Sequence, residues 1–390
     1  NRIVGVSIKP VPSVLELTYV FGHNDLDGSS TSGTVFTSTP TYINYFSTTE
    51  QLFVSGDNDH RVVVFDVSAP TNGDTATDVY GQISSGEINL TSTENYYPFN
   101  NEISATGLDI EGNSSHTFVD TVNHKMYVSD SANNRVLVYN LSSSNIPLDR
   151  TADNVLGQCN FNSNSPSDTG SQYFDGPTGL AMYDSGATQM LFVSDTGNNR
   201  ILVFNVTSIT DCEPAVNVLG QGDFNSSTPR IDDMGFTSPQ GIDVTIKGSE
   251  AYLFVADTGS NRVLSYNVKT VTDGETATAV LGQPDFVTSS AGTTTQKLNS
   301  PSDVDAYLDS ESMLSLVVSD TGNSRLLKYD FPGGSPVTNE IARNVLGQTD
   351  FTTGAPLSTP SVTSSNFGQS GPKGLELNTN NSILCVADPE

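Results

Sequence analysis

A sixteen-residue pattern recurs along this chain and constrains its fold more than any other feature. The clearest copy is LFVSDTGNNRILVFNV at 191–206, and related copies begin at positions 52, 126, 253 and 316. Each copy contains one arginine, and these arginines lie 62 to 74 residues apart: Arg61, Arg135, Arg200, Arg262 and Arg325. Repeats of this length, built from short apolar runs and glycine-rich turns, are typical of solenoids and propellers.

One period is interpreted as four β-strands. In the third repeat the apolar runs cover 178–183, 190–194, 200–206 and 215–221. Each run is short, rich in Val, Leu, Ile, Phe and Tyr, and bounded by Gly, Asn, Asp, Ser or Pro, which favours strands. The segment 195–199 is expected to form a tight turn, because Gly197 can take a positive φ at no steric cost and Asn tolerates a positive φ better than most residues.

The two ends of the chain complement each other. The last repeat stops after two strands, whereas residues 1–6 resemble the start of a third strand and 14–22 a fourth strand. We therefore predict an all-β, six-bladed β-propeller of four-stranded antiparallel blades, with the sixth blade closed by both termini. The single domain 1–390 then divides into a shared blade (1–22 and 372–390) and five others: 39–82, 105–158, 177–221, 239–283 and 301–348.

The chain resembles the NHL-repeat family of six-bladed β-propellers. Three motifs carry the resemblance and span nearly all 390 residues: the P-x-G-[LI] starts, the V-[SA]-D-T-G-x-x-R turns and the VLGQ strands. The resemblance implies the propeller fold. It does not select an activity, because this fold serves lyases, lactonases, RNA-binding modules and interaction platforms.

Charge and composition exclude several classes of function. With 44 acidic and 16 basic residues the net charge is −28, and no basic cluster is present, so a nucleic-acid partner is excluded. No apolar run approaches the roughly 18 residues of a transmembrane helix. Only 15% of residues are charged, and the Ser, Thr and Asn content favours a secreted or cell-surface protein, hence an extracellular location. The six N-glycosylation sequons are no more than this composition gives by chance.

The three cysteines are predicted to be unpaired. Cys159 follows a fourth strand, and Cys212 lies between a third and a fourth strand. Such loops lie at opposite ends of a blade, about 17–20 Å apart, whereas a disulfide needs Cα atoms within about 7 Å. We therefore expect no intrachain disulfide. Cys385 takes the place of Phe192 in a second strand and is predicted to be buried.

The Asp-x-x-Asn-x-Arg turns are interpreted as scaffold. A carboxylate at the end of one strand and a guanidinium at the start of the next can brace both the turn and a neighbouring blade. The pairs are Asp130 with Arg135, Asp195 with Arg200, Asp257 with Arg262, and Asp320 with Arg325. Repetition in nearly every blade favours a structural role, because a substrate rarely has six-fold symmetry.

A second set of acids falls at one position of the first strands. Alignment on the prolines makes these residues equivalent: Asn44, Asp109, Ala181, Asp243, Asp305 and Glu376. First strands line the axis of a propeller, where converging carboxylates repel unless a cation intervenes. Their oxygens suit Ca²⁺, so Asn44, Asp109, Asp243, Asp305 and Glu376 form a candidate metal site. The alternative is that each acid accepts backbone N–H groups of the adjacent blade or faces channel water.

Catalytic signatures are sparse. A histidine-bound zinc lyase is disfavoured, because the four histidines occupy unrelated positions in their repeats: His23, His60, His116 and His124. Neither a Gly-x-Ser-x-Gly elbow nor a phosphate loop is present, so no catalytic or cofactor-binding residue is assigned. A calcium-dependent lactonase- or lyase-like enzyme with a carboxylate-lined axial site is the alternative function.

Long loops follow the fourth strands, and propeller topology places all of them on one face. They cover 24–38, 83–104, 159–175, 222–238, 284–300 and 349–371. Loops beyond about 12–15 residues are often functional, and the Ser, Thr, Gly and Asn content of these loops suits hydrogen bonding. We therefore predict a protein- or glycan-binding or assembly module that uses this face. The alternative is that the loops are solvated filler.

Overall fold

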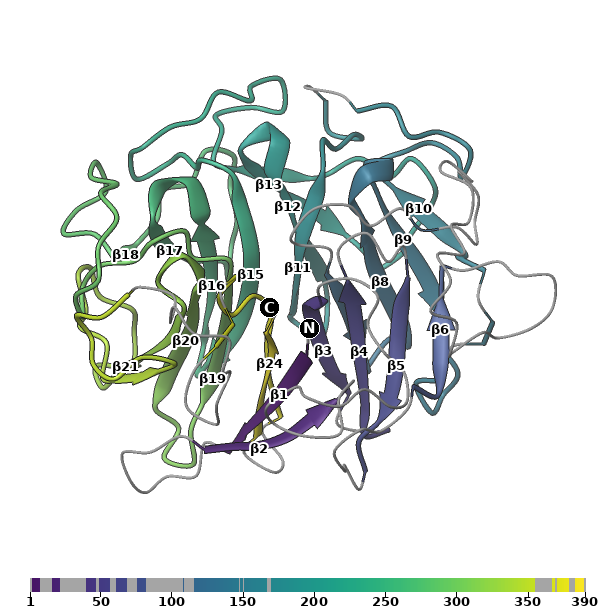
Figure 1. Ribbon diagram of the computed structural model, residues 1–390. Coiled ribbons are helices and arrows are strands. Elements are labelled where there is room, and N and C mark those ends of the chain that lie inside the picture. The colour runs from purple at the N-terminus through teal and green to yellow at the C-terminus, as the bar shows by residue number, and fades with distance from the viewer. Residues whose placement is uncertain are drawn as a thin grey trace.

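Six four-stranded antiparallel sheets make up the computed structural model of this chain (Figure 1). The structure describes residues 2–7, 16–21, 40–46, 49–56, 61–68, 76–81, 108, 116–146, 148–149, 151–166, 170–354, 367–368, 370–378 and 383–388. The first strands of the sheets contact one another in the order β3, β7, β11, β15, β19, β23, and β23 contacts β3 again. The sheets therefore form a closed ring, and the predicted six-bladed propeller is confirmed.

Five blades are continuous in sequence, and each runs from an inner to an outer strand. The strands of the first two are β3 (Pro40–Phe46), β4 (Gln51–Gly56), β5 (Val62–Asp66) and β6 (Asp78–Tyr80), then β7 (Thr117–Asp120), β8 (Lys125–Asp130), β9 (Arg135–Asn140) and β10 (Asn154–Leu156). The next two contain β11 (Pro177–Asp184), β12 (Gln189–Asp195), β13 (Arg200–Asn205) and β14 (Asn217–Leu219), then β15 (Pro239–Lys247), β16 (Glu250–Asp257), β17 (Arg262–Asn267) and β18 (Ala279–Leu281). The fifth contains β19 (Asp303–Leu308), β20 (Leu314–Asp320), β21 (Arg325–Phe331) and β22 (Asn344–Leu346).

The sixth blade combines the two ends of the chain. Its strand order is β2 (Glu16–Phe21), β1 (Arg2–Ser7), β24 (Ile383–Asp388) and β23 (Leu375–Asn378). Strand β1 pairs antiparallel with β24, with Val4 opposite Val386 (Figure 1). This pairing confirms the predicted closure by both termini. It satisfies two strand edges that would otherwise be open to pairing with another chain.

The apolar core lies between the blades. Six clusters of buried side chains are present, and each combines residues of two adjacent blades. For example, Tyr127 and Val136 of one blade pack with Leu180 and Leu191 of the next. Cys385 is a buried free thiol in the cluster between the sixth and first blades, as predicted. Each blade is therefore stabilised by its two neighbours.

Short 3-10 turns connect the second and third strands in four blades: η1 (Ser131–Asn133), η2 (Thr196–Asn198), η3 (Thr258–Ser260) and η4 (Thr321–Asn323). Of the two residue types expected to tolerate a positive φ in this turn, the asparagine takes it: Asn199 has φ 51°, whereas Gly197 does not have a positive φ. Gly197 is needed for a different reason: a Cβ there would lie 2.8 Å from the backbone oxygen of Asp175. No helix in the described ranges is long and apolar enough to cross a membrane.

A disulfide joins Cys159 to Cys212, so the prediction of unpaired thiols is wrong for these two residues. Their Cα atoms are 4.1 Å apart. The two loops belong to adjacent blades, and the intervening strand β10 has only three residues, a span of roughly 7 Å. The loop of the following blade lies along this short strand, where the Asp211 carboxylate accepts the Val155 N–H at 3.0 Å.

Candidate functional site

Four Asp–Arg ion pairs lie completely buried at the turns between the second and third strands. Their Nε–Oδ2 distances are 2.6–2.7 Å, and both side chains of each pair have zero exposure. We call these aspartates the bracket acids: Asp130, Asp195, Asp257 and Asp320. In three of the four pairs an Asn amide also donates to the carboxylate. The turns hold these charges because a guanidinium neutralises each carboxylate where it is buried, and in three of them an Asn amide adds a hydrogen bond.

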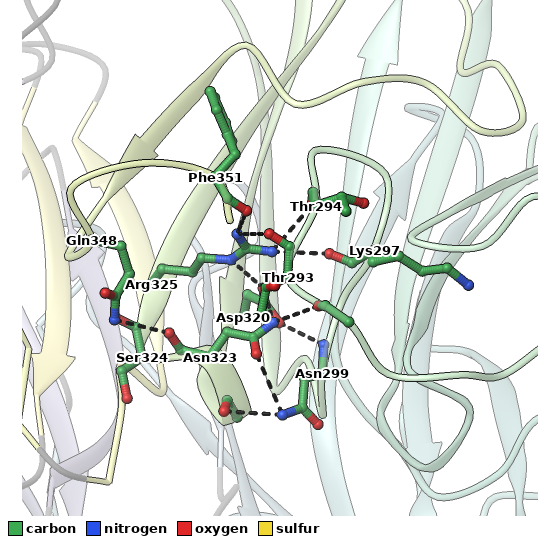
Figure 2. Close-up of polar contacts among 12 residues, drawn as sticks. Thr293, Thr294, Lys297, Asn299, Asp320, Asn323, Ser324, Arg325, Gln348 and Phe351 are labelled. Atoms are coloured by element: carbon green, nitrogen blue, oxygen red, sulfur yellow. Dashed lines mark hydrogen bonds and ion pairs between the residues drawn. The ribbon is translucent and has the colours of Figure 1, made fainter. Parts of the chain in front are cut away.

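Three of the four bracket arginines, Arg200, Arg262 and Arg325, also tie two long loops together, as the contacts of Arg325 illustrate (Figure 2). Its Nη1 donates to the Phe351 carbonyl at 2.6 Å, in the loop that follows its own blade. Its Nη2 donates to the Lys297 carbonyl at 3.0 Å, in the loop that precedes the blade. One buried guanidinium therefore fixes the bases of two successive loops.

The same connection recurs at the two preceding blades. Arg262 donates to the Phe286 carbonyl at 2.5 Å and to the Gly235 carbonyl at 2.9 Å. Arg200 donates to the Phe224 carbonyl at 2.6 Å and to the Gly170 carbonyl at 3.1 Å. These contacts confirm the predicted bracing of turns and neighbouring blades, and they extend the bracing to the loops.

Side-chain amides fix the long loops further toward their tips. In the loop 222–238, the carbonyls of Ser227 and Thr228 accept hydrogen bonds at 3.0 Å from Asn199 and Gln221. The corresponding amides in the loop 284–300 come from Asn261 and Gln283. The exposed side chains at these two tips include Ile231 and Val287. We call the surface formed by 222–238 and 284–300 the loop face. The predicted loops 24–38 and 83–104, and parts of two others, lie outside the described residues.

The axial ends of the blades carry a second group of acids, which are partly buried. Strand register places one residue of each first strand at the predicted axial position: Asn44, Phe118, Ala181, Asp243, Asp305 and Glu376. Phe118 rather than Asp109 faces Tyr127 in its blade, and Asp109 itself lies outside the described residues. The acids therefore occupy three consecutive blades, on β15, β19 and β23.

A second axial layer lies two residues nearer the loop face. Two residues before the axial position of each blade stand Tyr42, His116, Gly179, Gly241, Asp303 and Gly374; of these, Tyr42 lies opposite Ser55 and Asp303 opposite Ser319. Tyr42 and His116 stack with ring centroids 3.4 Å apart. Asp303 was not among the predicted site residues, although it stands where the P-x-G motif has Gly179, Gly241 and Gly374. We call Asp243, Asp303, Asp305 and Glu376 the axial acids.

The axial acids accept hydrogen bonds from the next blade around the ring. Asp243 accepts the Ala306 N–H at 2.8 Å, and Asp303 accepts the Leu375 N–H at 2.7 Å. Asp305 accepts the backbone N–H of Leu377. Glu376 closes the series in the first blade, through the Tyr45 N–H and an Asn44 amide at 3.2 Å. These contacts favour the alternative interpretation, in which the acids join adjacent blades.

Burial raises the pKa of every axial acid. The pKa of Asp305 rises to about 8, because burial and the neighbouring Asp243 both disfavour its charged form. Burial raises the pKa of Asp243 to about 6, and it raises the pKa values of Asp303 and Glu376 well above their ordinary range. Within the described part of the chain, Asp303 Oδ1 and Asp305 Oδ2 are buried without a hydrogen-bond partner. Burial therefore favours the neutral form of these carboxyl groups, and Asp305 is mostly protonated near pH 7.

The predicted calcium ligands are only partly assembled. Asn44 directs its amide nitrogen toward Glu376, and both Asp243 oxygens already accept backbone N–H groups. Among the residues that the structure describes, no three His, Cys, Asp or Glu side chains are grouped as metal ligands. The observed contacts do not form a cation cage, so a cation at Asn44, Asp243, Asp305 and Glu376 stays a prediction.

Comparisons with known proteins add structural neighbours only. No family model and no curated protein matches the chain. One similar structure is a functionally unknown protein from Desulfotomaculum acetoxidans (11% identity, 98% of this chain, 87% of that chain, TM-score 0.48). An auxiliary nutrient binding protein from Bacteroides thetaiotaomicron is also similar (10% identity, 99% of this chain, 76% of that chain, TM-score 0.49). Another comes from Bacteroides ovatus (13% identity, 90% of this chain, 70% of that chain, TM-score 0.48). The fold assignment rests on the sheet topology of this chain itself.

Proposed function

We propose that this chain is an NHL-type propeller that binds a protein or a glycan on its loop face, as a module of a secreted or cell-surface protein. The observation that carries the proposal is the fixing of successive loops by the buried arginines Arg200, Arg262 and Arg325. Loops held in one conformation lose little entropy when a ligand binds. Solvated filler would not need a buried guanidinium between each pair of loops.

The disulfide supports an extracellular location. Disulfides persist in oxidising compartments and are rare in cytosolic proteins. The link between Cys159 and Cys212 therefore agrees with the composition, which has few lysines and an abundance of Ser, Thr and Asn.

A matched pair of surface substitutions tests the role of the loop face. Val287 on the loop face is 69% exposed, and Val122 is 72% exposed in a hairpin that topology places on the opposite face. Wild type, Val287→Asp and Val122→Asp would be compared on a glycan panel and with the secreted fraction of the source culture. We expect Val287→Asp to weaken retention of the bound species at least about tenfold, the cost of a charge in a contact. Loss with Val122→Asp alone would contradict the proposal.

A second candidate function is an enzyme at the axis, of the calcium-dependent lactonase or lyase type. The observation in its favour is the pair of partnerless buried oxygens, Asp303 Oδ1 and Asp305 Oδ2, beside carboxyl groups with raised pKa values. Orphaned buried polar atoms of this kind are frequent at catalytic or ion-binding positions.

Turnover on a panel of lactones and esters, with and without EGTA, separates the two candidates. An axial enzyme requires activity that is lost with EGTA and with Asp243→Asn. Absence of turnover across the panel, together with loss of binding in Val287→Asp, supports the binding module.

A further inference from the structure

The disulfide joins a long loop to the neighbouring blade at one seam of the ring. Cys159 begins the segment that leads to the loop face, and Cys212 lies between β13 and β14 of the next blade. Two hydrogen bonds accompany the link: the Gln172 side chain donates to the Cys212 carbonyl at 2.8 Å, and the Ala215 N–H donates to the Ser171 carbonyl at 2.7 Å. Residues 170–173 are therefore held from the side of the next blade.

The same segment contacts a bracket arginine. The carbonyls of Gly170 and Tyr173 accept hydrogen bonds from Arg200 Nη2 at 3.1 and 3.2 Å. In addition, the Gly170 N–H donates to the Phe224 carbonyl at 2.8 Å, in the loop 222–238. The disulfide is thus connected to the loop face through residues 170–173, which bind Cys212 by one hydrogen bond and Phe224 by another.

The next seam of the ring provides a natural comparison without a disulfide. There Gly222 and Gly274 occupy the positions of Cys159 and Cys212, and a Cβ on Gly274 would lie 3.4 Å from the Gly222 Cα. The hydrogen bonds are repeated: Asp273 accepts the Val218 N–H at 3.0 Å, and the Ala277 N–H donates to the Asp233 carbonyl at 2.7 Å. The disulfide is an addition to a seam that other blades form with hydrogen bonds alone.

Two properties make the disulfide open to change. Cys159 is exposed and Cys212 is partly exposed, so a thiolate can reach the sulfur atoms. Cys212 also has a φ of 66°, where the equivalent Gly274 has 69°. A glycine adopts this left-handed backbone freely, whereas a cysteine does so at a cost. The covalent link therefore holds Cys212 in a conformation that it would not favour when reduced.

We propose that the Cys159–Cys212 disulfide is a redox-sensitive clasp that sets the position of residues 170–173 at the edge of the loop face. An external dithiol opens the clasp: one thiolate attacks a sulfur of the disulfide, and its second thiolate displaces the resulting mixed disulfide. Two electrons and two protons pass to the cysteines, and the dithiol leaves as its own disulfide. The regulatory meaning rests on the proposed function of the loop face, but the clasp itself does not.

Amide hydrogen exchange of the full chain, before and after treatment with dithiothreitol, tests the clasp without any ligand. The reporters are the N–H groups of Val155 and Ala215 at the clasped seam. The matched controls are Val218 and Ala277 at the Gly222–Gly274 seam. We expect reduction to accelerate exchange at the reporters about tenfold, as local opening becomes easier, and to leave the controls unchanged.

The double variant Cys159→Ser/Cys212→Ser should exchange like the reduced protein and should not respond to dithiothreitol. That variant separates the effect of the clasp from any effect on the buried thiol of Cys385. Equal exchange at both seams before and after reduction would overturn the proposal. So would three titratable thiols in unfolded, unreduced protein, since the clasp requires that only one be free. A failure of the Val287→Asp binding test would leave this result unaffected, so the two proposals fail separately.

Discussion

The bracket acids are fully buried and the axial acids, apart from Asp303, partly so, and the two groups have different partners. Each bracket acid contacts an arginine at 2.6–2.7 Å, and the arrangement repeats in four blades. The axial acids accept backbone N–H groups of the next blade, and among the described residues they occupy three consecutive blades. The bracket pairs recur from blade to blade, so they stabilise a structure that these blades share. The axial acids do not recur in this way, so they mark the blades that differ from the others.

The pKa values express the same difference. Burial raises the pKa of Asp195 and Asp257 to about 6, with the neighbouring arginines opposing the rise. Asp305 reaches about 8, because the carboxylate of Asp243 adds to the effect of burial. Asp195 and Asp257 are therefore largely ionised at neutral pH, whereas Asp305 is mostly protonated, and burial shifts the pKa values of Asp303 and Glu376 in the same direction.

The largest loss of unfolding free energy is expected when a bracket arginine is removed. Arg262→Ala leaves the buried carboxylate of Asp257 without its partner, and it frees the carbonyls of Gly235 and Phe286. Breaking a buried pair in this way costs about 3–5 kcal/mol of unfolding free energy. Denaturant unfolding would measure it. The control is Arg230→Ala, whose ion pair with Asp232 is 40% and 32% exposed and should contribute less than about 1 kcal/mol. Equal losses in the two variants would remove the distinction between scaffold and surface pairs.

A smaller loss of stability is expected when the pH is raised, and the axial acids should contribute to it as they lose their protons. Because the pKa of Asp305 is raised in the folded protein, the unfolded chain loses its proton first, near pH 4. Stability should therefore fall as the pH rises from about 4 through about 8, by a few kcal/mol. Thermal melts across this range would show the fall. Asp305→Asn keeps the shape of the side chain and should reduce the fall chiefly between about pH 6 and about pH 8, because Asp195, Asp257 and Asp243 contribute below that range. A profile identical to that of wild type would show that Asp305 is not the titrating group.

Added calcium tests whether the axial acids bind a cation. An ion bound by Asp243, Asp305 and Glu376 would favour their ionised forms and reverse the loss of stability above pH 7. If the predicted site exists, millimolar Ca²⁺ should raise the melting temperature of wild type at pH 8 and leave Glu376→Gln unchanged. An unchanged wild-type melting temperature would exclude the ion and leave the acids as links between blades.

The smallest loss of unfolding free energy is expected from a substitution that disturbs the close approach of two first strands. A Cβ on Gly241 would lie 2.6 Å from the Cα of Asp303, so Gly241→Ala must push β15 and β19 apart. Overpacking of this kind costs about 1–3 kcal/mol. Gly222→Ala is the control, since no atom lies within 4 Å of its Cβ, and we expect it to change unfolding free energy by less than about 0.5 kcal/mol. An equal response would show that the axis is loosely packed.

The repeat made the fold and the brackets predictable from the sequence. Four strand signals per period, and two half-repeats at the ends, sufficed for the closed ring with Val4 opposite Val386. The arginines were assigned to the scaffold because they recur. The axial position was predictable where a proline fixes the register, as for Asp243 and Asp305, but not in the second blade. There β7 begins at Thr117 and brings Phe118 to the axis.

Contacts between blades were harder to predict. The disulfide was missed because the separation of its loops was judged within one blade, whereas Cys212 comes from the next blade and lies along a three-residue strand. Asp303 was missed because it replaces a motif glycine, a change that looks like loss of a turn residue. Its significance appears only when the neighbouring strand supplies the Leu375 N–H.

Infrared spectroscopy of the carboxyl groups tests the central comparison most directly. Protonated and ionised carboxyls absorb at separate frequencies, so a titration counts the protons that stay buried. The account predicts a protonated-carboxyl band in wild type at pH 7, reduced in Asp305→Asn and unchanged in Asp350→Asn, an exposed control whose pKa the hydroxyl and N–H of Thr352 lower to about 2. A spectrum without protonated carboxyls at pH 7 would contradict it, because the axial acids would then be ionised like the bracket acids.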